Sequence, residues 1–188
     1  MSGQEVTLQI SEVDSLSIGN VRQTDVPVGV FDMTQLLPGA DIGGFISLGF
    51  FKDTAFTIDD QKKILTLETN SSLEKTKALG TTVPIAFNQQ GVSVSVHMPL
   101  ILPNGKRISA DKDVKHKNGK DETGHSFDRY FTKLKGSVHL LERPDMNVDG
   151  INVMFQKIIY DGLVGQHFLR QFVITYDLKK SEMIFRKP

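Results

Sequence analysis

The polar segment from Asp111 to Gly124 is the part of the sequence whose residue types could do chemistry. Its first twelve residues, which end at Glu122, have the length and the terminal Glu of a calcium-binding EF-hand loop. The fifth and sixth positions are Lys115 and His116, where such a loop needs an oxygen ligand and a glycine. Cations inside the loop would also repel calcium, so we expect neither a bound metal nor any other cofactor.

Other residue patterns argue against several further kinds of site. The five His residues are scattered without HExxH spacing, and the absence of Cys removes thiolate chemistry and Cys-based zinc sites. The Gly-rich run 39–44 lacks the Lys-Ser/Thr of a phosphate-binding loop. The formal charge is zero, with 22 basic and 22 acidic residues, so we expect no nucleic-acid partner. The basic run 112–120 has no interleaved aromatic residues and fits a solvated loop.

The elements that must position any site are mostly strands. Alternating or apolar runs bounded by turn residues predict strands over 5–11, 13–20, 26–31, 83–87, 92–102, 106–110, 137–141 and 151–159. The remaining segments predict a linker or short helix over 70–82, a loop over 111–124, a helical turn over 126–134 and a polar connection over 142–149. Gly19-Asn20 indicates a tight turn at the end of the second strand, 13–20. We therefore expect an all-β protein.

An internal repeat relates two parts of the chain. Residues 43–67 align without a gap on residues 161–185, which lie 118 positions later. Identical residues in the two copies are Gly44 and Gly162, Phe50 and Phe168, Thr57 and Thr175, Asp59 and Asp177, and Lys62 and Lys180. Each copy reads as a tight turn, one or two helical turns, and a hairpin of two strands. A repeat this long is no solenoid and suggests two related lobes.

The repeat unit resembles the C-terminal half of a lobe in retropepsin-like and pepsin-like aspartic proteases. The resemblance rests on the aliphatic-aliphatic-Gly step Leu163-Val164-Gly165, the helical FLRQF segment after it, and the hairpin VITYDLKKSEMIF. It covers most of the chain and is nearest to the compact bacterial relatives with two lobes in one chain. It implies acid-protease-like β-barrel lobes, with 1–69 as the C-terminal half of a first lobe, 70–82 as a linker and 83–188 as a complete second lobe.

The resemblance also implies a site. In this family each lobe gives one Asp, held in an Asp-Thr-Gly loop, and the paired carboxylates activate a water that attacks a peptide bond. The candidate in the second lobe is Asp121, with Thr123 and Gly124 after it. The alternative is Asp113, by its distance from the Asn104-Gly105 turn. Val164 and Gly165 would support the catalytic loop from behind.

The sequence departs from the family pattern at three places. Glu122 is inserted where the Thr should stand, and Val114-Lys115 follows the alternative Asp113. The first copy has Ile46-Ser47 in place of an aliphatic-Gly step. The first lobe's own Asp-Thr-Gly is absent and is expected to lie before Met1. Segment 111–124 therefore also fits a solvated surface loop without catalysis.

These features give two alternatives for function. One is an aspartic-type endopeptidase, or part of one, that is inactive as a lone monomer and takes its second carboxylate from a missing N-terminal lobe half or from a homodimer partner. The other is a non-catalytic protein of the same fold that binds peptides, for example by strand addition. Both imply a peptide or protein partner. No apolar run is long enough to span a membrane, and the N-terminus has no signal-peptide core, so a periplasmic or secreted location would need a signal elsewhere.

Overall fold

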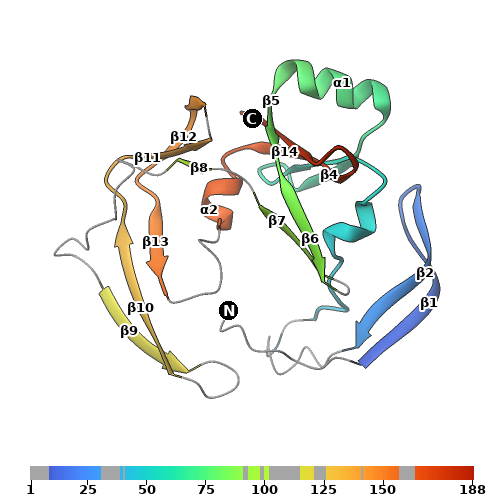
Figure 1. Ribbon diagram of the computed structural model, residues 1–188, viewed down its shortest axis with the longest axis horizontal. Helices are drawn as coiled ribbons and strands as arrows, with labels where there is room; N and C mark the ends of the chain where they lie inside the picture. Colours follow the sequence, from blue (N-terminus) through green and yellow to red (C-terminus); the bar gives the residue numbers. More distant parts are fainter. Residues whose placement is uncertain are drawn as a thin grey trace.

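The computed structural model describes most of the chain (Figure 1). The described residues are 9–30, 39, 41–90, 93–97, 100–101, 115–120, 126–140, 142–156 and 164–188. In this part of the chain the protein consists mostly of antiparallel strands with a few short helices, so the all-β prediction is confirmed. The division into 1–69, 70–82 and 83–188 stays a prediction.

A five-stranded antiparallel sheet holds both copies of the repeat. Its strand order is β4-β3-β14-β15-β5. The bounds are β3 Phe56–Asp59, β4 Ile64–Leu67, β5 Thr81–Pro84, β14 Val173–Asp177 and β15 Glu182–Arg186. The first copy gives the hairpin β3-β4 and the second gives β14-β15, so the two hairpins meet side by side through β3 and β14.

The register of this central pairing has two-fold symmetry. Thr57 lies opposite Thr175, its own counterpart in the repeat. The pairs on either side, Ile58 with Ile174 and Phe56 with Tyr176, map onto each other when the copies are exchanged. A pseudo-two-fold axis therefore passes between Thr57 and Thr175, and it relates the first hairpin to the second.

The two hairpins also repeat their turn chemistry. Asp59 Oδ1 accepts the backbone N–H of Lys62 at 3.0 Å, and Asp177 Oδ1 accepts that of Lys180 at 3.1 Å. The next residues, Lys63 and Ser181, both have positive φ, at 58° and 54°. Because an L-residue rarely adopts this left-handed conformation, its presence at equivalent positions shows that the two turns have the same backbone shape.

The other strands form four smaller antiparallel sheets. These are β1-β2, β6-β7, β13-β10-β9 and β12-β11-β8. Their bounds are β1 Gln9–Ile18, β2 Val21–Val30, β6 Ala86–Gln90, β7 Ser93–His97, β8 Leu100–Ile101, β9 Lys115–Lys120, β10 Ser126–Lys133, β11 Ser137–Leu140, β12 Arg143–Asp149 and β13 Asn152–Phe155. The predicted turn at Gly19-Asn20 joins β1 to β2 and is confirmed.

The helix α1, Asn70–Leu79, links the first hairpin to β5. It begins with a capping box, in which Thr69 Oγ1 accepts the N–H of Ser72 at 3.2 Å and Ser72 Oγ accepts the N–H of Thr69 at 2.9 Å. Its far end passes over β15, where it contributes the ion pair of Lys77 with Glu182. This helix falls inside the segment predicted to be a linker or short helix.

Short helical turns stand before each hairpin of the repeat. The first copy has η2, Leu48–Phe51, and the second has α2, Gln166–Leu169. Their equivalent side chains Phe50 and Phe168 are both buried. A further turn, η4 Leu178–Lys180, lies between β14 and β15. The predicted order of helical turn and hairpin is therefore confirmed in each copy. The tight turn predicted before it is not formed at 43–47 in the first copy and falls on residues outside the described part in the second.

The apolar side chains form two clusters. The larger joins β14 and β15 to β5, α2 and the sheet β12-β11-β8; its most buried members are Leu140, Phe185, Phe172 and Met183. The smaller packs Phe50, Phe51 and Phe56 against the β1-β2 hairpin. Tyr176 touches both clusters. The first copy thus has a much smaller set of apolar neighbours than the second.

Several local predictions were wrong. The break predicted between the strands 5–11 and 13–20 does not exist, since β1 runs through it as Gln9–Ile18. Residues 126–134 hold no helical turn, since 126–133 form β10. The predicted loop over 111–124 contains β9, and the polar connection over 142–149 contains β12. In β10 the partly buried and exposed residues alternate with period two, and backbone hydrogen bonding to a neighbouring strand overrides the polar composition of β9 and β12.

Candidate functional site

The predicted catalytic residues lie next to a pair of strands. Asp121, Thr123, Gly124 and the alternative Asp113 themselves fall outside the described residues. The described flanks are β9 and β10, which pair antiparallel with Lys120 opposite Ser126. The segment that carries Asp121 therefore connects two adjacent strands of the β13-β10-β9 sheet.

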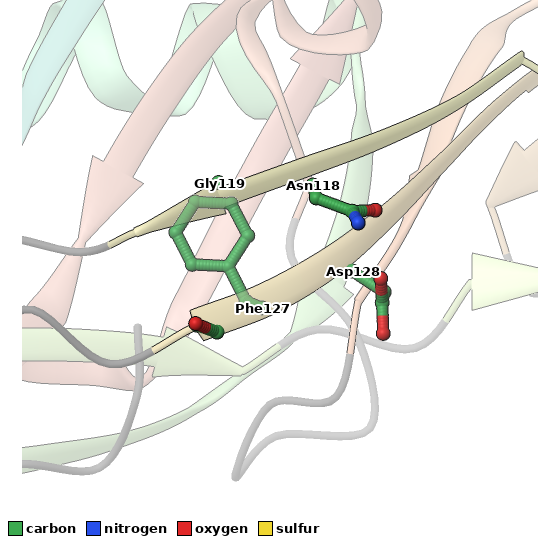
Figure 2. Close-up of a pocket in the computed structure, with 5 residues that line it drawn as sticks. Asn118, Gly119, Phe127 and Asp128 are labelled. Atoms are coloured by element: carbon green, nitrogen blue, oxygen red, sulfur yellow. The ribbon is translucent and has the colours of Figure 1, made fainter.

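A hollow of about 450 Å³ lies on these two strands. It is lined by Asn118, Gly119, Ser126, Phe127 and Asp128. Figure 2 shows the ring of Phe127 lying over Gly119, its partner in the strand register. A Cβ at Gly119 would stand 2.5 Å from two ring carbons, so a larger residue here would require the Phe127 ring to move.

Further charged and aromatic side chains lie on the same two strands, β9 and β10. The guanidinium carbon of Arg129 lies 4.0 Å from the centroid of the Phe127 ring, and Arg129 Nε donates to Gln156 Oε1 at 2.7 Å. On the same strands the His116 ring stacks on Tyr130 with centroids 4.7 Å apart. His116 Nε2 lies 2.9 Å from Asp128 Oδ1. Both members of this pair are well exposed to solvent.

The described residues do not complete a known catalytic or metal centre here. His116 pairs with Asp128 and stacks on Tyr130, and among the described residues these contacts bring no nucleophilic side chain to the pair. Within the described ranges, no three His, Asp or Glu side chains are grouped so that they could hold a metal ion. The side chains that line the hollow offer one aromatic ring, one carboxylate, one amide and one hydroxyl, and acid–base chemistry on a peptide bond would need a further group.

The predicted supporting residues lie at the start of α2. Gly165 is the N-cap of this helix, and its carbonyl accepts the N–H of Phe168 at 3.1 Å. Both Val164 and Gly165 are exposed, and none of the described atoms lies within 4 Å of a Cβ added to Gly165. The described part of the chain therefore offers no close backbone approach to explain this glycine, and its support of a catalytic loop stays a prediction.

The first copy shows why a serine can replace this glycine. Ser47, the counterpart of Gly165, is the N-cap of η2, and its Oγ accepts the N–H of Gly49 at 3.3 Å. Serine is a preferred N-cap residue because its hydroxyl satisfies a free N–H of the first turn. The departure at Ile46-Ser47 therefore has a local role in starting the helical turn.

Asp59 and Asp177 are the buried carboxyl groups at equivalent positions of the two copies. The backbone N–H of Lys62, and then its ammonium group 3.0 Å away, hold the pKa of Asp59 below its ordinary value. Asp59 lies opposite Val173, four residues along the strand from Asp177. At about 3.3 Å per residue the two are roughly 13 Å apart, too far to share a water. They cap turns and do not form a catalytic pair.

Polar groups meet instead at the pseudo-two-fold axis. Thr57 Oγ1 and Thr175 Oγ1 lie 2.6 Å apart, and Thr57 also donates to Glu68. Ser72 of α1 donates to the same carboxylate. Because Glu68 accepts the Thr57 proton, the buried hydroxyl of Thr175 must donate to Thr57. The alignment of Thr57 on Thr175 was visible in the sequence, but the contact between them was not predicted.

Comparisons of the chain with protein-family models, with curated proteins and with solved structures found no match. The arrangement of the described residues is therefore the basis for assigning a function. Among the described residues, no helix is both long and apolar enough to cross a membrane.

Proposed function

We propose that this chain is part of an aspartic-type endopeptidase with acid-protease-like lobes, in which Asp121 is the carboxylate of the second lobe. The observation that carries the proposal is the pairing of the two repeat hairpins around the pseudo-two-fold axis at Thr57 and Thr175. Two lobes related in this way would each present one carboxylate to a shared water. One carboxylate takes the proton of the water as it attacks, and the other protonates the peptide oxygen or leaving nitrogen.

The second carboxylate of such a pair has to come from outside this chain. The sequence contains no intact Asp-Thr-Gly, and Asp121 is the better of its two candidates. The edge of β14 is already paired with β3. A second copy could therefore not use that edge without displacing the first hairpin, so the half of the first lobe that the resemblance implies is a simpler source than a homodimer partner. The isolated monomer is expected to be inactive.

A non-catalytic peptide-binding protein is the second candidate. It is favoured by two outer strands whose large apolar side chains are exposed: Ile64 and Leu65 on β4, and Met154 and Phe155 on β13. Exposed strand edges of this kind pair with extended peptides. The inserted Glu122, which would displace the carboxylate of Asp121 or its hydrogen bonds, favours the same alternative.

Peptide cleavage measured between pH 3 and 7 separates the two candidates. The wild type, Asp121→Asn and Asp113→Asn would be incubated with a mixed peptide library, and the oligomer mass would be recorded on the same samples. Acid-favoured cleavage that is lost only in Asp121→Asn supports the peptidase with Asp121 in its dyad. Loss only in Asp113→Asn would support the peptidase but assign its carboxylate to Asp113.

Failure of the folded wild type to cleave is informative once peptide binding is measured on the same library. Saturable binding without cleavage at any pH favours the binding protein over a peptidase active as isolated. Cleavage that persists in both single variants would contradict the assignment of either Asp. Circular dichroism of each variant verifies that the chain is folded before its activity is compared.

A further inference from the structure

The pseudo-two-fold axis relates β3 to β14 and β4 to β15, so the neighbours of each pair of equivalent strands can be compared. In the second hairpin, the outer strand β15 is covered by β5, with Met183 opposite Val83 and Phe185 opposite Thr81. Its counterpart β4 is the last strand of the sheet, and among the described residues it pairs only with β3. In the described part of the chain, the sheet is therefore symmetric about the axis except for one strand position beyond β4.

The side chains of β4 are more exposed to solvent than those of β15, as expected for a strand that lacks a neighbour on its outer side. Leu65 is 46% exposed, whereas its counterpart Met183 is 2% exposed. Leu67 is partly buried, while its counterpart Phe185 is fully buried. Leu65 and Leu67 share a face with their cross-strand partners Ile58 and Phe56. An apolar residue added beside Leu65 would extend the cluster to which Ile58, Phe56 and Leu67 belong.

The backbone of β4 offers the matching hydrogen-bond groups. Glu68 N–H donates to Ala55 O, and this bond places 57 with 66 and 59 with 64 as the hydrogen-bonded pairs of the ladder. The N–H and C=O groups of Leu65 and Leu67 then point to the outer edge. In the second hairpin Ile85 N–H donates to Ser181 O, so Met183 and Phe185 likewise face β5.

We propose that the outer edge of β4 binds an extended strand of a separate polypeptide in the register that β5 uses on β15. The occupant lies antiparallel to β4, with a β-branched apolar residue opposite Leu65. Its residue opposite Ile64 donates no hydrogen bond to β4, which is why Pro84 is accommodated opposite Glu182 in the second hairpin. The β5–β15 pairing in the same sheet is the basis for this choice of occupant, and the proposal holds whether or not the chain cleaves peptides.

The strand β5 itself supplies the probe. A fluorescein-labelled peptide with the sequence of residues 80–86, GTTVPIA, would be titrated against the full chain, and binding would be followed by fluorescence anisotropy. A second peptide carries N-methylvaline at the Val position, which removes the N–H that would bond to Leu65 O. The variant Leu65→Lys removes the apolar contact, and Ile10→Lys, at another exposed apolar residue of an outer strand, is the matched control.

We expect saturable binding that weakens at least tenfold with the N-methylated peptide and at least tenfold in Leu65→Lys, but is unchanged in Ile10→Lys. On binding, the amides of Leu65 and Leu67 should become protected from hydrogen exchange. Equal affinity for Leu65→Lys would mean that the peptide replaces β5 on β15, and it would overturn the proposal. So would the absence of binding by the folded wild type. A dimer that forms without peptide and is lost in Leu65→Lys would assign the edge to a second copy and not to a separate partner.

Discussion

The hydroxyl groups of Thr57 and Thr175 form the contact on which the two halves of the central sheet meet. Thr175 is completely buried and donates to Thr57, which in turn donates to Glu68. A buried donor that loses its acceptor destabilises the fold by its full desolvation free energy, about 1–3 kcal/mol. The order of donation therefore decides which of the two residues is more sensitive to replacement.

We expect Thr57→Val to lower the free energy of unfolding by about 2 kcal/mol, because the Thr175 hydroxyl loses its acceptor. Thr175→Val leaves Thr57 its bond to Glu68 and should cost about 1 kcal/mol. The double variant should lose less stability than the sum of the two single losses, since it leaves no buried hydroxyl without an acceptor. Urea denaturation of the four proteins measures this cycle. Additivity within about 0.5 kcal/mol would contradict the direct contact.

Residue types explain what could be predicted at the candidate site. The two copies could be aligned from the sequence because both keep the Asp and the Lys of the hairpin turn. These are Asp59 and Lys62 in the first copy, and Asp177 and Lys180 in the second. The hollow beside Phe127 could not be predicted, because it depends on the strand register that places Gly119 opposite the Phe127 ring. Asp121 and Asp113 lie outside the described residues, so their assignment stays a prediction.

Among the elements, the crossing of α1 over β15 leaves no free space for a side chain at Gly80. The helix ends at Gly80, where an added Cβ would overlap Ile184 Cγ2 and stand 3.1 Å from the carbonyl oxygen of Phe185. Ile184 is fully buried and cannot move aside freely. The packing at Gly80, with φ at −116°, excludes a side chain even though the backbone conformation itself suits any residue.

We expect Gly80→Ala to lower the free energy of unfolding by about 1–3 kcal/mol, because the added methyl group overpacks the crossing. Gly165→Ala is the matched control: it also replaces a glycine beside a helix end, but no described atom lies within 4 Å of its new Cβ. Its effect should stay within about 0.5 kcal/mol. Thermal and urea unfolding would be compared for both. Equal destabilisation by the two replacements would argue against the packing at Gly80.

Strands and turns were predicted correctly from the sequence where the hydrophobic pattern was compatible with only one type of secondary structure. The hairpins of the repeat and the turn at Gly19-Asn20 are examples. It failed at 126–133, because Asp128, Phe131 and Leu134 also fit the spacing of a helical face. It failed at 115–120 because a strand made of Lys, His, Asn and Gly is specified by its partner β10 and not by its own composition.

At the scale of the whole molecule, burial is concentrated in one sheet. Most side chains of β3, β14 and β15 are buried, whereas β1, β9 and β10 are largely or alternately exposed. Regions with few buried apolar contacts open at a lower free energy than the core. The β1-β2 and β9-β10 pairs should therefore open without unfolding of the five-stranded sheet.

Native-state amide hydrogen exchange tests this difference in stability. The slowest amides should belong to β14, β15 and the side of β3 that bonds to β14, and their opening free energy should approach that of global unfolding. Amides of β1, β2, β9 and β10 should exchange through smaller openings. Uniform protection across all strands, at the free energy of global unfolding, would contradict the separation.

The duplicated hairpin has a consequence for mutational tolerance. The same backbone occurs twice in one molecule, once with its outer strand enclosed and once with it open to solvent. A polar substitution at Met183 or Phe185 should therefore lower the free energy of unfolding much more than one at Leu65, where little packing is lost. The first copy is the one whose sequence is free to diversify, so a library confined to its outer strand could alter what the molecule recognises while the second copy keeps it folded.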